Sequence, residues 1–463
     1  MRKLDSRALF YRFAAPLAAL AVFFAMSRLY LGEDKALYFD ILRWWGVKPF
    51  RFPFADISVN LAAWQCSRHG IDVVLWNPCD VLKRPYVYSP LWMAFRAIPL
   101  GVKDTPLVGS IIDFLFLLSL GFLPRPRRPF ELALVLAATL STMVAFAVER
   151  ANFDVVLFLM VLASALLAEG RFAPRLLGYG VALFAALLKY YPIMALVILF
   201  RERTRRFIAI SLSILAILIA FLAAYRTEIA EGMAGIPHGS YLTDMFGARN
   251  LPFFLGQLAG DALASAGSAG LAERLLGLLA YAFLLGAFIA ICRRLLRWQE
   301  FRDGLGRLAE RERVLLVTGS SIIAGCFFAG QSVGYRGVYF LLVLPGLLAA
   351  ARGAADARLR PLLIGASAVI GFLMWEEFFR LSLYRLLDHS SLAKGAVLGV
   401  EITFFVAREL AWWWVVAAMA AILADFLLRS EVVFALRRFL PRPAAAKEEA
   451  GSQSLPVQSR RGL

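Results

Sequence analysis

The chain has 463 residues, of which 60% are hydrophobic, and its mean hydropathy is +0.69. Soluble domains are nearer to half apolar, and the excess here lies in long uninterrupted blocks, which excludes a large soluble domain. A formal charge of +17 would indicate nucleic-acid binding in a soluble protein. Lys and Arg in short cytoplasmic loops explain the charge better, because no soluble face remains to hold a nucleic acid.

A run of about 18 apolar residues can cross the hydrocarbon core as a helix, and such runs follow one another along almost the whole chain. They predict an all-α integral membrane protein with about 12 transmembrane segments, including one broken pair of half-helices. In chain order, the predicted segments are 13–31, 106–123, 130–148, 153–168, a pair within 176–200, 207–224, 273–292, 314–331, 337–351, 361–379 and 409–428.

The first apolar block, 13–31, follows Arg2, Lys3, Arg7 and Arg12. It resembles a secretory signal, but it is long and no A-x-A cleavage site follows it. We therefore interpret it as an uncleaved first transmembrane helix.

Basic residues predict the orientation of the bundle. About 30 of the 50 Lys and Arg fall on the side that holds both termini, which the positive-inside rule makes cytoplasmic. We expect one membrane domain over 1–430 and a cytoplasmic tail over 431–463 that is disordered after about residue 443. The expected periplasmic segments are 32–105, 225–272 and 380–408.

The block 176–200 does not fit a simple alternation of crossings, because basic residues precede and follow it. It is too short to cross about 30 Å twice as full helices. Two half-helices that meet near Lys189 would fit, and such breaks are tolerated only inside protein or beside a cavity. A lysine in an apolar block costs ~2.5–3.5 kcal/mol on insertion scales, so Lys189 is a candidate ligand for an anion. The alternative is a lysine whose side chain extends to the membrane interface.

The first external segment contains an expected helix over 55–69 that lies on the membrane surface. Asp56 falls in its first turn, where the helix dipole favours a carboxylate. An Asp at a helix start is more often a cap than a catalyst.

The chain resembles glycosyltransferase family 87, the DUF2029 group of polyprenyl-phosphate-mannose-dependent mannosyltransferases, and more broadly the GT-C superfamily. The resemblance covers roughly residues 10–430 and is carried by four features in order: Asp56 before a short helix, Gly70-Ile-Asp-Val73, Tyr88-Ser-Pro-Leu91 and Lys189-Tyr-Tyr-Pro192. Two departures are Ser89, where the family has Pro, and the extension 33–53 before Asp56.

The resemblance implies a GT-C-like bundle and an Asp in the first external loop as general base. Asp56 matches best, and the extension 33–53 leaves Asp40 as an alternative. The expected activity is transfer of mannose or another hexose from a polyprenyl-phosphate donor to a lipid-linked or glycan acceptor, at the periplasmic side of the inner membrane. The alternatives are a flippase or transporter of lipid-linked sugars, for which no internal repeat is seen, and a non-catalytic scaffold.

One carboxylate base and several cations are what this chemistry needs, because a lipid phosphate leaves readily once its charge is stabilised. The candidate phosphate ligands are Lys189, Arg336 and Arg150, of which Arg150 fits a salt bridge with Glu149 better. Further candidate substrate-binding residues are Tyr88, His69, Tyr335 and Asn152.

We expect no cofactor and no metal. Glu376 and Glu377 are the only acidic motif in the sequence that could be a candidate for binding a divalent ion. The absence of a Gly-rich phosphate loop argues against a nucleotide-sugar donor. The expected partners are the donor, the acceptor and membrane lipids, and nucleic acid is not among them.

Cys66 and Cys79 share the external segment and would pair in an oxidising periplasm if close enough, which the sequence does not decide. Cys292 and Cys326 lie in predicted helices, where we expect them to pack. Asp113 and Asp425 also lie in predicted helices and are candidates for buried paired charges, with a position near the cytoplasmic interface as the alternative for Asp425.

Overall fold

The computed structural model describes residues 6–32, 34–235, 241–262 and 269–439. Over these ranges the regular secondary structure is helical, apart from one short antiparallel pair of strands, β1 (Met245–Phe246) and β2 (Ser332–Val333). This strand pair is an addition to the predicted all-helical architecture.

Eight helical stretches of the described ranges are long and apolar enough to cross a membrane, or nine if one bent helix pair counts as a span. The chain is therefore a multi-pass membrane protein, as predicted. The eight are α1 (Ser6–Leu31), Val102–Phe122 around α4 (Thr105–Ser119), α5 (Pro129–Thr139) with α6 (Thr142–Glu149), α9 (Thr204–Ala224), α12 (Ala269–Arg297), α14 (Glu310–Ala329), Gly334–Gly353 with α15 (Phe340–Gly353), and α18 (Lys394–Leu428).

The other predicted segments correspond to shorter or bent elements. The helices α7 (Phe153–Ala168) and α8 (Phe172–Leu188) and the 3-10 helix η4 (Tyr191–Arg201) are apolar but short. The helices α16 (Leu359–Met374) and α17 (Glu376–Asp388) meet at an angle of 60°. A total of about 12 crossings stays a prediction.

The break inside the predicted pair is confirmed. Helix α8 ends at Leu188, and Lys189 is extended, with φ −159° and ψ 122°. Arg175 at the start of α8 donates from Nε to Glu202 Oε1, which follows η4, at 2.5 Å. The hairpin of α8 and η4 therefore begins and ends at the same end of the bundle.

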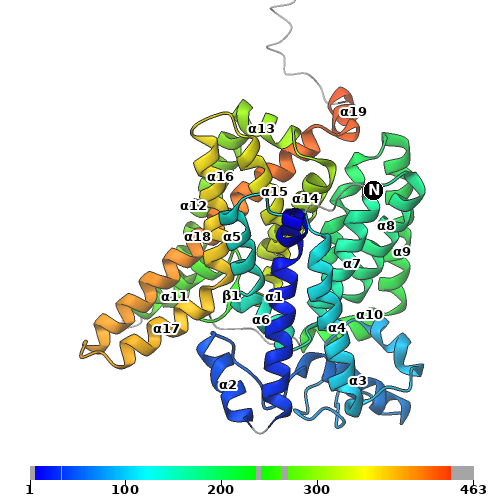
Figure 1. The fold of residues 1–463 in the computed structure, drawn as a ribbon, viewed down its shortest axis with the longest axis vertical. Helices are drawn as coiled ribbons and strands as arrows, with labels where there is room; N and C mark the ends of the chain where they lie inside the picture. The colour runs from blue at the N-terminus through cyan, green and yellow to red at the C-terminus, as the bar shows by residue number, and fades with distance from the viewer. Residues whose placement is uncertain (1–5, 33, 236–240, 263–268, 440–463) are drawn as a thin grey trace, which may run out of the picture.

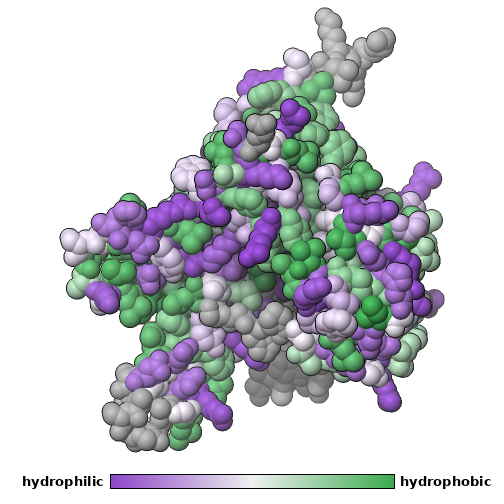
Figure 2. All heavy atoms as spheres, turned by 90° about the horizontal axis from the view of Figure 1, so that it is seen from below, coloured by the Kyte–Doolittle hydropathy of each residue, from purple (hydrophilic) through white to green (hydrophobic). Residues whose placement is uncertain are grey.

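The two ends of the molecule differ (Figure 1). The start of α1 lies at the same end as α13 (Gln299–Gly306) and α19 (Glu431–Phe439). The opposite end holds α2 (Lys35–Trp44), α3 (Ala55–Arg68) and α10 (Arg226–Ala234). Seen from that opposite end, hydrophilic and hydrophobic residues alternate in patches (Figure 2). Placement of the two ends of the described chain on one side agrees with the predicted topology.

Burial separates a central from a peripheral set of helices. In the apolar window of Gly334–Gly353, 83% of residues are buried, against 6% in α9 and 11% in α12. Side chains of α9 and α12 are apolar yet exposed, as expected for helices that face lipid.

Three boundaries or environments differ from the prediction. The expected surface helix is present as α3, but 11 of its 14 residues are buried, because the loop that follows folds back over it. Helix α18 begins at Lys394 and not near 409, which places helix inside the expected external segment 380–408. The tail starts with α19, and the disorder predicted after about residue 443 lies outside the described residues.

Candidate functional site

The start of α3 is docked on the turn between α6 and α7. The backbone N–H of Phe54 donates to the carbonyl of Glu149 at 2.7 Å, and that of Asp56 donates to the carbonyl of Arg150 at 3.1 Å. Phe54 and Ala151 have positive φ angles of 64° and 42°, a conformation that non-glycine residues keep only when their surroundings enforce it. The turn therefore fixes the position of Asp56.

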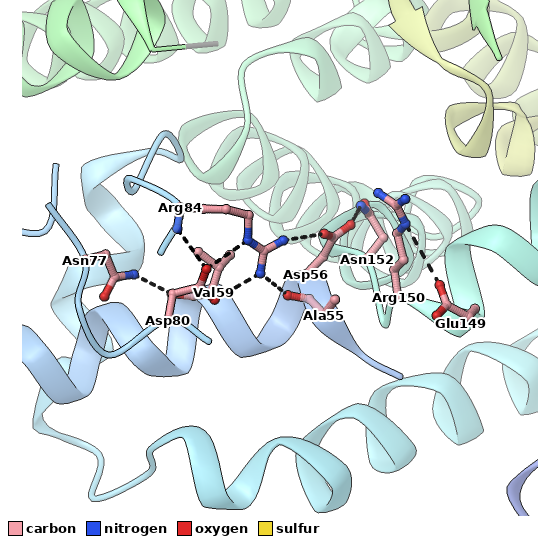
Figure 3. A network of polar contacts seen from close by, with 9 residues as sticks. All are labelled: Ala55, Asp56, Val59, Asn77, Asp80, Arg84, Glu149, Arg150 and Asn152. Atoms are coloured by element: carbon pink, nitrogen blue, oxygen red, sulfur yellow. Dashed lines mark hydrogen bonds and ion pairs between the residues drawn. The ribbon is translucent and has the colours of Figure 1, made fainter. Parts of the chain in front are cut away.

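The Asp56 carboxylate is 5% exposed and has two polar partners (Figure 3). Asn152 Nδ2 donates to its Oδ2 at 2.5 Å, and Arg84 Nη1 lies 3.5 Å from its Oδ1. Asn152 is also the N-cap of α7, where its Oδ1 accepts the backbone N–H of Asp154 at 2.8 Å. The predicted substrate ligand Asn152 thus orients the candidate base.

Arg84 lies between two carboxylates. Its Nε is 3.0 Å from Oδ2 of the fully buried Asp80, and its Nη2 donates to the Ala55 carbonyl at 2.6 Å. Burial by itself would lower the pKa of Arg84, but the hydrogen bond and charge of Asp80 and the charge of Asp56 raise it above its ordinary value. We call Asp56, Asp80, Arg84 and Asn152 the acidic group, because it contains two carboxylates and only one cation.

A second set surrounds Asp154, with two cations for one carboxylate. Lys189 Nζ and the Tyr191 hydroxyl donate to Asp154 Oδ1 at 2.5 and 2.8 Å. Arg336 Nε lies 3.7 Å from Oδ2, within ion-pair distance but beyond a hydrogen bond. We call Asp154, Lys189, Tyr191 and Arg336 the basic group. The structure therefore brings together Lys189 and Arg336, which are far apart in the sequence.

Aromatic rings connect Arg150 to the basic group. Its guanidinium carbon lies 4.4 Å from the Phe50 ring and 4.1 Å from the Phe146 ring. The Phe146 ring is 5.6 Å from that of Tyr335, which Lys189 Nζ approaches to 5.7 Å. Cation–π contacts of this kind hold a cation without neutralising it. The expected salt bridge of Arg150 to Glu149 is loose, with 3.9 Å between the charged atoms.

Tyr88 lies between the two groups. Its ring is 4.6 Å from that of Phe153, which separates Asn152 from Asp154. Burial raises the pKa of Tyr88 well above its ordinary value, and the charges of Asp56, Tyr335 and Asp154 act in the same direction. Its hydroxyl therefore stays protonated and can donate a hydrogen bond.

Two predicted residues are not part of this arrangement. Asp40 is exposed on α2 and forms an ion pair with Arg43 at 2.9 Å. His69 follows the last residue of α3 and is exposed. With 1.5 Å of rise per residue, it lies about 20 Å from Asp56 along the helix.

The sequence analysis missed Asp154, Arg84 and Tyr191. Asp154 has a local signal, since Asn152 two residues earlier suits an N-cap and a carboxylate in the next turn is favoured. Asp80 and Arg84 are four residues apart, a spacing that allows an ion pair.

The structure shows which cysteines are paired. Cys66 of α3 and Cys79 form a disulfide, so the open question of their pairing is answered. Cys326 is buried, and Cys292 Sγ lies 3.1 Å from the carbonyl of Ala417, which confirms that both pack within the bundle.

Other acidic residues have separate surroundings. Glu376 accepts from the Trp412 indole at 3.0 Å, and Glu377 pairs with Arg380 at 2.5 Å. No three potential metal ligands of His, Cys, Asp or Glu gather within the part of the chain that the structure describes.

The two aspartates expected as buried paired charges differ. Asp425 pairs with Arg302 and Arg429 at 2.9 and 2.7 Å, as expected. For Asp113 the prediction of a paired charge is wrong, because among the described residues neither of its carboxyl oxygens has a hydrogen-bond partner.

A scan against protein-family models and searches of curated proteins and solved structures find no match for this chain.

Proposed function

We propose that the chain is a glycosyltransferase that moves a sugar, mannose or another hexose, from a polyprenyl-phosphate donor to a lipid-linked or glycan acceptor. The proposal places it in the inner membrane, with the site at the periplasmic side. Asp56 is the general base, and Lys189, Arg336 and Arg150 stabilise the phosphate.

One observation carries the proposal. The first turn of α7 contacts both groups, because Asn152 binds Asp56 and Asp154, two residues on, binds Lys189. A candidate base and a candidate phosphate site thus share one rigid element, as a transfer between two bound substrates requires.

The reaction balances with these residues alone. The acceptor hydroxyl oxygen bonds to the anomeric carbon of the sugar while Asp56 takes the hydroxyl proton. The bond from the anomeric carbon to the phosphate oxygen breaks, and the lipid phosphate leaves with its electron pair. Lys189 and Arg336 exceed Asp154 by one charge and are placed to stabilise the leaving phosphate.

A transporter of lipid-linked sugars is the alternative. It would use the cations for the phosphate but would need no base, so Asp56 distinguishes the two functions.

The test compares Asp56→Asn with Asp40→Asn in an assay with defined polyprenyl-phosphate sugars. Asn keeps a hydrogen-bond acceptor for Asn152, so we expect folding to persist while transfer falls about 10²- to 10⁴-fold. Asp40→Asn should transfer sugar at the wild-type rate. Full activity of Asp56→Asn would refute the assignment, and loss of activity only in Asp40→Asn would move the base to that residue.

A further inference from the structure

A cavity of about 310 Å³ lies beside the acidic group, between α1, α2, α4, α5 and α6. This volume is in the range of small-molecule sites. Most of its wall residues are apolar, and Phe54 and Ser58 at the start of α3 are among them. The residues that form its walls include Val22, Phe23, Met26, Tyr38, Phe54, Ser58, Thr105, Ser110, Leu117, Leu140, Val144 and Glu149.

Several buried polar atoms at this cavity lack partners among the residues that the structure describes. They are the hydroxyl oxygens of Ser58 and Thr105 and both carboxyl oxygens of Glu149, all from residues in the cavity wall. Asp113, whose carboxyl oxygens also lack a described partner, lies eight residues from Thr105 along α4, about 12 Å away, and is not part of the wall. Buried polar groups nearly always find a partner, so the hydroxyl groups of Ser58 and Thr105 form an unfilled hydrogen-bonding site.

The cavity wall contains one carboxyl group, that of Glu149, which lies 3.9 Å from Arg150 Nε. The walls include no Lys or Arg from the described residues. A phosphate would meet a carboxyl group in this wall and no Lys or Arg of the described residues, which disfavours it.

We propose that this cavity binds a neutral lipid with a hydroxyl group, its hydrocarbon chain against the apolar wall residues and its hydroxyl at Ser58 and Thr105. Asp56 does not line the cavity, because it lies two residues before Ser58 on α3 and faces Asn152 and Arg84. The proposed lipid site is therefore separate from the candidate base and does not depend on the proposed function.

The probes are a photoreactive isoprenoid alcohol and its monophosphate ester, applied to the full chain in nanodiscs without any sugar donor. We expect the alcohol to label peptides of α1, α4 and α6, and the unmodified alcohol to compete. Ser110→Phe fills the cavity and should reduce this labelling about tenfold. Ile111→Phe changes the adjacent, 50% exposed residue on the outer face of α4, and its labelling should match the wild type.

Thr105→Val keeps the volume and removes one hydroxyl, so it tests the site even if Ser110→Phe does not fold. We expect about two- to tenfold weaker binding of the alcohol. Equal or stronger labelling of the same peptides by the monophosphate would overturn the proposal, as would the absence of competed labelling or an unchanged affinity in Thr105→Val. The readout is binding alone, so an inactive Asp56→Asn neither supports nor weakens it, and a failed cavity leaves the Asp56 test intact.

Discussion

The acidic and basic groups meet at one helix start but are built differently. The acidic group comes mainly from α3 and the loop that follows it, which the Cys66–Cys79 disulfide joins. The basic group comes from the α8–η4 hairpin and from the segment that precedes α15. The acidic group has more carboxylates than cations, and the basic group has more cations than carboxylates. Only two residues of α7, from Asn152 to Asp154, separate these two opposite environments.

The largest expected effect is on the basic group. Asp154→Asn removes the only carboxylate that Lys189 and Arg336 both contact in the described structure, and an unpaired buried charge costs about 3–5 kcal/mol. We expect a clearly lower thermal unfolding temperature in detergent. Asp113→Asn is the matched control, since that equally buried carboxyl has no cationic partner among the described residues. An equal loss in both variants would mean that pairing does not stabilise Asp154.

The next effect concerns the acidic group. Replacement of both Cys66 and Cys79 by Ser opens a loop with a sequence separation of 13 residues. In the chain-entropy account, a loop of this size contributes about 3 kcal/mol. We expect proteolysis within 70–85 to accelerate in the variant, measured against cleavage in α13. Cys292→Ser is the control, and unchanged proteolysis within 70–85 would show that the disulfide is dispensable for this loop.

The smallest effect separates the two groups by ligand. Lys189→Met should weaken binding of a polyprenyl monophosphate about tenfold, because one of its cations is lost. Binding of the neutral isoprenoid alcohol should not change. The exposed Lys103, replaced by Met, serves as control. If Lys189→Met binds the monophosphate as tightly as wild type, Lys189 only pairs with Asp154.

Much of the fold could be predicted because membrane helices must satisfy their own backbone, so long apolar runs show where they lie. The break at Lys189 was predictable for the same reason, from a block too short for two crossings. The burial of α3 was not predictable, since Leu61 and Trp64 suit a membrane surface as well as a protein interior. Only part of the candidate site could be predicted from the sequence. Asp56 and Lys189 were identified, whereas Asp154, which links them through Asn152, was missed.

The order of apolar and basic segments determined that the chain crosses a membrane many times and that its described ends share a side. Those properties depend on the transfer of local segments from water to lipid, which sequence composition reports directly. Only the tertiary structure decided which charges meet. Pairing of Lys189 and Arg336 on Asp154, and the lack of any described partner for Asp113, depend on contacts between helices that no local pattern encodes.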